Sequence, residues 1–311
     1  MIDTETQGRR AGIPAGLPCR ATIVAAEVVG RRTGKVGCQE PSYAVWLSQP
    51  DPRGLIMSTP VVLVTGALTG IGRAVAVAYA REGANLVVSG RHEDVGVELV
   101  DELSELGAQV AFVRADVRRD EDMADLIDRT VERFSHLDIA FNNAGTAGTP
   151  GPVTDVTDES YAATFDTNVL GTLLSMKHEF RAMRPQGGGS IINVSSTFGL
   201  MGYPNSTLYV GSKHAVIGIT RAAALEGAAH GIRVNAIAPG FTQTAMYERF
   251  TASDDVRDAV NSVLPMHRPG TPEEMAAAVL YIGSDKASYL TGQTIILDGG
   301  LTAGWPLFPT G

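Results

Sequence analysis

Tyr209 and Lys213 are four residues apart in the stretch STLYVGSKHA, where a helical pattern begins. This spacing is about one helical turn, so the two side chains project from one face. A free phenol has a pKa of about 10, too high for an efficient base near neutral pH, but a nearby cation stabilises phenolate and lowers that pKa. The pair could therefore act as an acid–base catalyst on a hydroxyl or carbonyl group. An ordinary polar helix face has the same spacing, so the other motifs must decide.

After residue 57, apolar runs of strand length alternate with amphipathic segments. Most runs are apolar throughout, as in strands buried on both faces of a sheet. Short connections between them imply right-handed crossovers with helices on both sides of a parallel sheet. We therefore predict one α/β domain over residues 57–311, a doubly wound Rossmann domain with a seven-stranded parallel sheet. The expected strands cover residues 61–65, 85–89, 109–114, 137–142, 190–195, 233–238 and 293–298.

Residues 1–56 differ in composition, because they are rich in Gly, Pro and Arg. We expect a disordered or loosely packed N-terminal extension, with a partner-binding arm as the alternative. At the other end, the tail LTAGWPLFPTG carries Trp305 and Phe308. These side chains are expected either to reach a neighbouring subunit or to cap the substrate pocket.

The composition excludes several classes of protein. The net charge of −9 argues against a nucleic-acid-binding surface, and no apolar run reaches the length of about 18 residues that spans a membrane. Cys19 and Cys38 are the two cysteines of the chain, so a cysteine-based zinc site cannot organise the domain, and the histidines form no metal-ligand pattern. We expect no metal, no nucleic acid and no membrane partner, and a cytoplasmic location.

A glycine-rich turn, TGALTGIG, follows the first expected strand and opens the first expected helix. Gly66, Gly70 and Gly72 would let the backbone turn tightly and approach a pyrophosphate at the helix N-terminus. The spacing G-x-x-x-G-x-G lacks the Gly-Lys-Ser/Thr of a P-loop, so a dinucleotide is a better candidate than a nucleoside triphosphate.

The end of the second expected strand should meet the ribose of the adenosine. An acid there would bind the 2′-hydroxyl, whereas an arginine would accept a 2′-phosphate. Gly90 stands where the acid would be, and Arg91 follows it. This favours NADP(H), with NAD(H) as the alternative if Arg91 is only a solvated loop residue whose charge is diluted by Glu93 and Asp94.

Together these features resemble the short-chain dehydrogenase/reductase family, from about Val61 to Gly300 and with the motifs in the family's order. The matching motifs are TGALTGIG, ADV, NNAG, TNVLG, NVSS, YVGSK, APGFTQT and TGQTIILDGG. The resemblance looks nearest to the subgroup of 3-oxoacyl-carrier-protein reductases, glucose 1-dehydrogenase-like enzymes and cyclic diol dehydrogenases.

The resemblance implies a catalytic set of Asn168, Ser196, Tyr209 and Lys213. Ser196 is preferred to Ser195 because the family's serine usually precedes the tyrosine by 13 positions. In the family, the lysine also holds the nicotinamide ribose, the serine positions the substrate oxygen and the asparagine holds a proton-relaying water. The implied cofactor contacts, with Arg91 added, are Gly66, Thr69, Gly70, Ile71, Gly72, Arg91, Asp116, Val117, Asn143, Ala144, Gly145, Tyr209, Lys213, Pro239, Gly240, Thr242 and Thr244.

We therefore predict an enzyme, an NAD(P)-dependent oxidoreductase that transfers a hydride between nicotinamide and a secondary alcohol or ketone. One alternative is a cyclic diol or sugar dehydrogenase that uses NAD. An alternative of another class is a non-catalytic dinucleotide-sensing protein. The complete catalytic set argues against it, because such a protein would not need all four residues. A nucleotide-sugar epimerase or dehydratase of the extended branch would need more than the roughly 70 residues that follow APG.

Two segments are expected to line the substrate site and to favour a small or medium, largely apolar alcohol or ketone. Their apolar residues are Phe198, Leu200, Met201 and Tyr203 after the catalytic serine, and Met246, Tyr247, Phe250 and Met266 after the sixth strand. A lid helix packed on the domain core is the alternative for the same residues. Family analogy suggests a homotetramer.

Overall fold

A computed structural model describes residues 59–251 and 253–304 of the chain. The predicted N-terminal extension and the tail residues Trp305 and Phe308 lie outside the described residues. Within them, no helix is both long and apolar enough to cross a bilayer.

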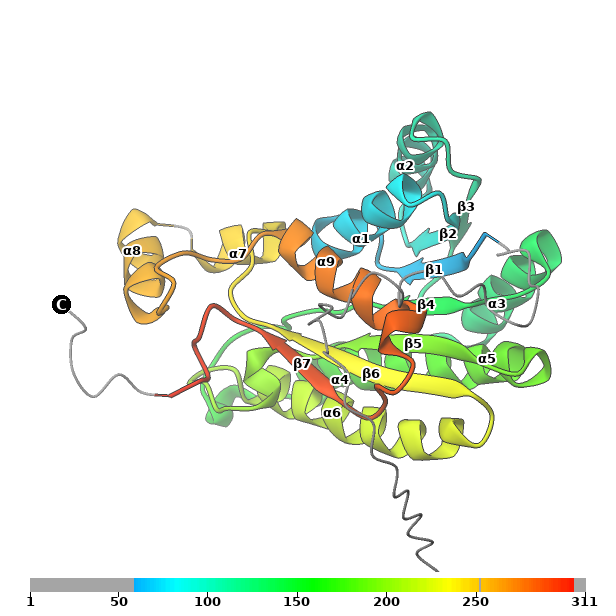
Figure 1. Ribbon diagram of the computed structural model, residues 1–311. Helices are drawn as coiled ribbons and strands as arrows, with labels where there is room; N and C mark the ends of the chain where they lie inside the picture. Colours follow the sequence, from blue (N-terminus) through cyan, green and yellow to red (C-terminus); the bar gives the residue numbers. More distant parts are fainter. Residues whose placement is uncertain (1–58, 252, 305–311) are drawn as a thin grey trace, which may run out of the picture. The chain divides into compact units, whose positions relative to one another are not determined.

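The described chain forms one parallel sheet of seven strands in the order β3-β2-β1-β4-β5-β6-β7, with helices on both faces (Figure 1). The predicted doubly wound α/β fold is confirmed. The strands are β1 Val61–Thr65, β2 Asn85–Gly90, β3 Val110–Arg114, β4 Ile139–Asn142, β5 Gly189–Val194, β6 Ile232–Pro239 and β7 Thr294–Leu297. Each strand boundary lies within two residues of the expected one.

The helices alternate with these strands, as the amphipathic segments predicted. They are α1 Gly70–Arg81, α2 Glu93–Glu105, α3 Asp120–Phe134, α4 Asp158–Phe165, α5 Gly171–Gln186, α6 Thr207–Ala228, α7 Ala245–Phe250, α8 Asp254–Val263 and α9 Pro272–Gly283. Short 3-10 turns η2 Val153–Asp155, η4 Thr197–Gly199 and η5 Asp285–Ala287 and the π-helical segment η3 Asp166–Leu170 join them.

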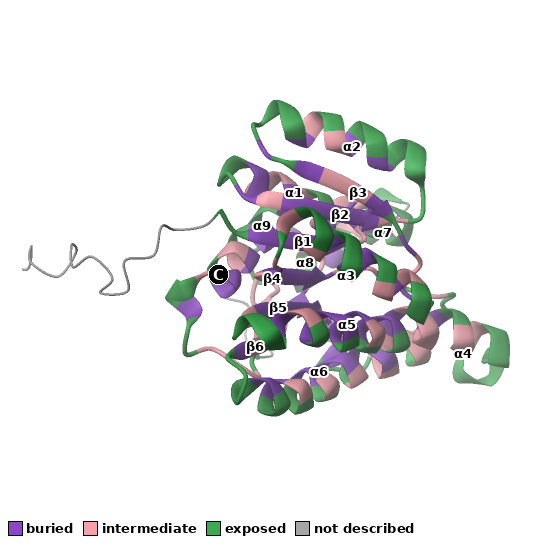
Figure 2. Cartoon of the chain, turned by 90° about the vertical axis from the view of Figure 1, so that its right-hand side faces the viewer, coloured by how far each residue is buried: buried purple, intermediate pink, exposed green. Residues whose placement is uncertain are grey.

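Helices cover both faces of the sheet, and alternate side chains of each strand therefore enter two different cores. Val62 and Val64 of β1 belong to the core beneath α1, α2 and α9, whereas Leu63 belongs to the core beneath α3, α5 and α6. Figure 2 shows the buried strands between helices whose outer faces are exposed. This double burial explains why the strand sequences are apolar throughout.

The strand order reverses next to β1. The chain runs from β1 outward to β2 and β3, then returns to place β4 on the other side of β1. In open α/β sheets, the crevice at such a switch point, outside the carboxyl ends of the strands, is where ligands bind. The loops that follow β1 and β4 are therefore the place to look for a functional site.

Candidate active site

Tyr209 and Lys213 lie in the first turns of α6, beside the carboxyl end of β5. The Lys213 Nζ atom lies 5.7 Å from the centroid of the Tyr209 ring and donates a 2.8 Å hydrogen bond to the Val194 carbonyl. Lys213 is buried, with 5% of its surface exposed. The spacing in the sequence therefore brings the phenol and the ammonium together, as expected.

The prediction that Lys213 lowers the pKa of Tyr209 is wrong for the polypeptide without a cofactor. Burial raises the pKa of the phenol above its usual value, and the opposing influence is the Ser196 hydroxyl. Burial also lowers the pKa of Lys213 to about 8. Removing water destabilises phenolate and ammonium alike, so each group shifts toward its neutral form.

The two serines after β5 have different surroundings. Ser196 begins η4, where its Oγ accepts a hydrogen bond from the Phe198 amide, and its hydroxyl is close enough to Tyr209 to influence the phenol. Ser195 Oγ instead donates a 2.9 Å hydrogen bond to the Lys213 carbonyl. Ser195 thus fastens this loop to α6, and Ser196 is the serine at the phenol.

Asn168 lies in the π-helical segment η3, just before α5, and is almost completely buried. Its Oδ1 accepts a hydrogen bond from the Thr146 amide, and its Nδ2 donates to the Thr146 carbonyl and to Ser212 Oγ. A Cβ atom built at Gly145 would lie 3.2 Å from Asn168 Oδ1 and 3.5 Å from Lys213 Nζ. Asn168 and Lys213 therefore flank the loop after β4 together. π-Helical turns often occur at functional sites.

The glycine turn after β1 packs directly on the loop after β4. Gly66 has a φ of +63°, and its carbonyl accepts a 2.9 Å hydrogen bond from Asn143 Nδ2. A Cβ atom at Gly72 would lie 2.3 Å from that carbonyl oxygen, so only glycine fits there. Ala144 lies against Gly66, where an added Cβ would be 2.8 Å from the Ala144 Cα.

Thr69 precedes α1 in extended backbone, and Ile71 lies in the first turn of this helix. The amides of such a first turn lack partners within their helix and can bind an anion. The predicted cofactor residues of the loops after β1 and β4 are therefore neighbours at the start of α1.

The loop after β6 meets the same glycine turn. A Cβ atom at Gly70 would lie 3.1 Å from Thr244 Cγ2. Thr244 Oγ1 donates to the Thr242 carbonyl and accepts from the Tyr247 amide at the start of α7. Pro239 ends β6, and Gly240 packs against the backbone of Asp298. These contacts fix both predicted threonines at the carboxyl edge of the sheet.

The adenosine end of the predicted site contains a residue that the sequence analysis missed. This residue is Arg118, whose Nε donates a 2.9 Å hydrogen bond to Asp116 Oδ1 and holds the pKa of Asp116 below the usual range. Arg91, which is exposed after β2, contributes to this lowering through its charge. The two arginines that follow ADV in the sequence could have indicated this pairing. Val117 is buried beside Gly171.

An aromatic cluster made of Phe198, Tyr203, Phe241, Tyr247 and Phe250 extends from the phenol to α7. Phe198 stacks on Tyr203 at 4.4 Å between centroids and meets the Tyr209 ring at 6.3 Å, nearly perpendicular. Phe241 lies 6.2 Å from Phe198 and 5.7 Å from Phe250. The sequence analysis missed Phe241, although it lies within APGFTQT. The expected residues Leu200, Met201, Met246 and Met266 are exposed.

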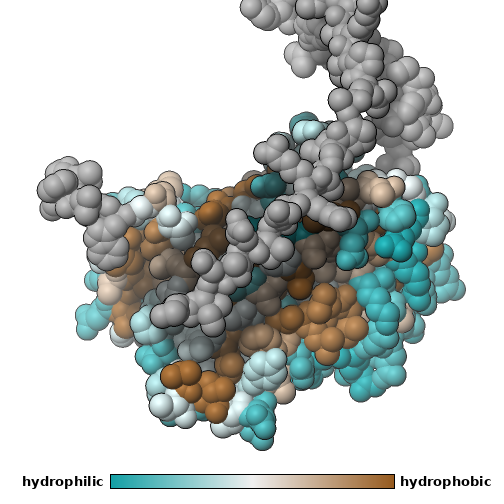
Figure 3. Space-filling view, turned by 90° about the horizontal axis from the view of Figure 1, so that it is seen from below, coloured by the Kyte–Doolittle hydropathy of each residue, from teal (hydrophilic) through white to brown (hydrophobic). Residues whose placement is uncertain are grey.

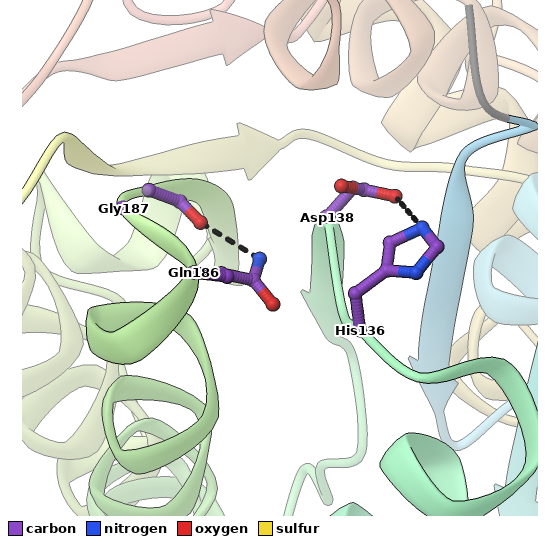
Figure 4. Close-up of a pocket in the computed structure, with 5 residues that line it drawn as sticks. His136, Asp138, Gln186 and Gly187 are labelled. Carbon is purple, nitrogen blue, oxygen red and sulfur yellow. Dashed lines mark hydrogen bonds and ion pairs between the residues drawn. The ribbon is translucent and has the colours of Figure 1, made fainter.

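A separate surface hollow lies at the opposite edge of the sheet, near the amino ends of β4 and β5 (Figure 4). His136 and Asp138 line one side, with Nε2 and Oδ2 3.0 Å apart, and Gln186 to Gly188 line the other. None of the predicted site residues lines this hollow. In the described part of the chain, no group of three or more His, Cys, Asp or Glu side chains lies close enough together to hold a metal ion.

Comparison with known proteins identifies the class. A family model described as enoyl-(acyl carrier protein) reductase matches residues 66–302. The chain belongs to the short-chain dehydrogenase/reductase family, and it is an NAD(P)-dependent oxidoreductase acting on alcohols and ketones. The finer resemblance to 3-oxoacyl-carrier-protein reductases has no specific support.

Three relatives illustrate this membership. The chain is 44% identical over 254 residues to an A-factor type gamma-butyrolactone 1'-reductase of Streptomyces virginiae, covering 81% of this chain and 98% of that one. It is 39% identical to a 2,5-dichloro-2,5-cyclohexadiene-1,4-diol dehydrogenase of Sphingobium indicum, covering 79% and 98%. The solved structure of ElxO with NADP bound has a TM-score of 0.75 and 31% identity, covering 79% and 100%.

We expect Gly72→Ala to weaken binding of the nicotinamide cofactor about tenfold or more, because the added methyl group displaces Gly66 from Asn143. Fluorescence titration with NADPH and NADH measures this effect. Gly218→Ala in α6 is the matched control, since no atom lies near its added methyl group. Unchanged affinity in Gly72→Ala would contradict the placement of the cofactor on this turn.

Proposed function

We propose that Tyr209 is the general acid–base catalyst of this oxidoreductase, that Ser196 orients the substrate oxygen and that Lys213 and Asn168 complete the set. The observation that carries the proposal is the convergence of the Ser196 hydroxyl and the Lys213 ammonium on one partly buried phenol. The phenol carries a proton near neutral pH, and it can donate this proton to a ketone oxygen. A bound nicotinamide would supply the hydride.

Tyr209→Phe should lower kcat by about 10²- to 10⁴-fold, because it removes the transferable proton and keeps the ring. Cofactor affinity should change little, and this separates an enzyme from a dinucleotide sensor. Steady-state turnover and fluorescence titration measure the two quantities. Tyr281→Phe, at an exposed tyrosine of α9, is the control. Full turnover by Tyr209→Phe would refute the assignment.

We propose that the cofactor is NADP(H), read by Arg91. Gly90 offers no acid to a ribose hydroxyl, and a Cβ atom there would lie 2.6 Å from Leu68 Cδ1, so no acidic side chain fits without displacing Leu68. Arg91 is exposed after β2, where a 2′-phosphate would lie. Arg118 already pairs with Asp116, which leaves Arg91 as the better phosphate ligand. The NADP-bound relative ElxO agrees with this choice.

Arg91→Ala should weaken NADPH binding about 10- to 100-fold and leave NADH binding nearly unchanged, since a charge-assisted phosphate contact is lost. The ratio of the two dissociation constants, measured by fluorescence titration, tests this. Arg119→Ala is a matched control, because that arginine is exposed nearby and pairs with Glu121 and Asp122. Equal losses for both cofactors would remove Arg91 as the phosphate reader.

We propose an uncharged cyclic ketone or alcohol as the substrate. The aromatic cluster places the flat Phe198–Tyr203 stack beside the phenol, and flat rings pack well on aromatic faces. The Sphingobium relative is named for a cyclic diol, which supports the same class and keeps a cyclic diol dehydrogenase as the second candidate.

With NADPH, kcat/KM for cyclohexanone should exceed that for 2-hexanone, an open-chain ketone with as many carbons, by about tenfold or more. Phe198→Ala should reduce this preference because it removes the aromatic platform. Val97→Ala, at an exposed residue of α2 outside the cluster, is the control. Equal rates for the two ketones in the unaltered protein would contradict the proposed substrate class.

We also propose a cytoplasmic homotetramer. Large apolar side chains are exposed on α4 and α5, on α9 and near β7, and Leu225 is 82% exposed on α6. Figure 3 shows apolar areas on the face that is lowest in Figure 1, where α6 lies. Surfaces of this kind often form subunit contacts. Light scattering of the full chain tests the assembly, and a monomer at micromolar concentration would contradict the tetramer.

Cell fractionation tests the proposed cytoplasmic location.

A further inference from the structure

Glu179 of α5 is a buried carboxyl group to which the proposed mechanism gives no role. None of its surface is exposed. Its Oε2 accepts a 3.1 Å hydrogen bond from Asn142 Nδ2, and its Oε1 has no partner among the described residues. An ionised carboxylate in such surroundings is costly unless a cation or several donors stabilise it.

Among the described residues, no cation stabilises Glu179. The described neighbours that its hydrogen-bond network reaches are Asn142 of β4, Asn193 of β5, Thr220 of α6 and Met176 of α5, all uncharged. The titratable residues next to it on α5 are bonded elsewhere. Lys177 and His178 pair with Asp120 of α3, and Arg181 pairs with Asp128 of α3.

Hydrogen-bond counting indicates a neutral acid. Asn142 uses its Nδ2 for both Glu179 and Asn193, while its Oδ1 is also buried and without a partner in the described chain. A proton on the carboxyl group makes Glu179 a donor, and the amide that it already contacts contains the unused acceptor. Burial raises the pKa of Glu179 to about 8, which agrees with the neutral form at neutral pH.

The network continues from Glu179 to the residues of the active site. Asn142 and Asn193 are paired across β4 and β5, and Asn193 Nδ2 donates to Thr220 Oγ1. Asn143 directly follows Asn142 in the chain, and its Nδ2 donates a hydrogen bond to the Gly66 carbonyl. The next residue on β5 is Val194, whose carbonyl holds Lys213 Nζ.

We propose that Glu179, as a neutral carboxylic acid, is a positioning residue that holds the ends of β4 and β5 in register beneath the cofactor loop and Lys213. The inference rests on the role proposed above for Lys213 and on the cofactor contact predicted for Asn143. Because the network includes the residues just before Asn143 and Val194, a displacement of the Asn142–Asn193 pair moves both of these contacts.

The first test concerns the protonation state and needs no substrate. A carboxyl group whose pKa is raised on folding destabilises the native protein progressively as pH rises from about 4.5 to about 8, because the unfolded state ionises first. Glu179→Gln is neutral at every pH. The melting temperature of Glu179→Gln minus that of the unaltered protein should therefore increase from pH 5 to pH 8. A constant difference over this range would overturn the neutral acid.

The second test concerns positioning. Glu179→Leu removes the acceptor of Asn142 and should weaken binding of NADPH, or of NADH if that binds more tightly, about tenfold, whereas Glu179→Gln should restore it. Ser175→Ala is the matched control, because this buried hydroxyl of α5 bonds the Gly171 carbonyl of its own helix. Unchanged affinity in Glu179→Leu, or an equal loss in Glu179→Gln, would overturn the positioning role.

If Glu179→Leu does not fold, Thr220→Val breaks the same network at α6 and should weaken cofactor binding in the same direction; an unchanged affinity would overturn the proposal. Failure of the unaltered chain to bind either cofactor would instead refute the proposed function. The two failures are thus distinguishable.

Discussion

The close contact between the loops after β1 and β4 is the constraint on which the rest of the site depends. Thr65 Oγ1 accepts hydrogen bonds from the Asn143 and Ala144 amides, and Asn143 Nδ2 donates to the Gly66 carbonyl. These bonds cross the switch point of the sheet, where the two strands are direct neighbours. The approach is so close that side chains at Gly66 and Gly72 would collide with the backbone or with Asn143. The start of α1 is therefore fixed by β4 as much as by β1.

Residues adjacent in sequence to the proposed catalytic ones hold the elements of the site together. Ser195 fastens the loop of Ser196 to the Lys213 carbonyl, and Ser212 bonds Asn168. Each of these contacts comes from a residue adjacent in sequence to a proposed catalytic one. A helix, a strand end and a π-helical turn are thereby joined without using the phenol itself, which stays available for a substrate. Rigid support of this kind is what precise proton transfer requires.

The fold was largely predictable from the sequence because strands buried on both faces leave a continuous apolar signal. The signal fails at the strand ends, where polar side chains take over. Asp138, for example, was expected in a strand, but it precedes β4 and its carboxylate accepts from the Val61 amide. Motif spacing also indicated which residues converge, including the choice of Ser196 over Ser195.

Properties that depend on burial were not predictable. Spacing places Lys213 beside Tyr209, but it does not reveal how much water the surrounding elements remove, so the direction of the phenol pKa shift was wrong. Phe241 and Arg118 were missed because their partners are set by loop conformation. Glu179 was missed because it lies in the segment KHEFR of α5. Its charged neighbours in this segment face outward, and nothing in the sequence distinguishes the one carboxyl group that faces inward.

Burial shifts three titratable groups of this region toward their neutral forms. The Tyr209 phenol and the Glu179 carboxyl group have raised pKa values, and the Lys213 ammonium has a lowered one. A site with few net charges suits an uncharged substrate, because no buried charge is left unpaired when water is displaced by an apolar ring. The low dielectric that disfavours charge also strengthens each remaining hydrogen bond. The aromatic cluster and the neutral polar network beneath it thus share one physical condition, the exclusion of water, which suits the proposed apolar substrate and holds the phenol in its protonated form.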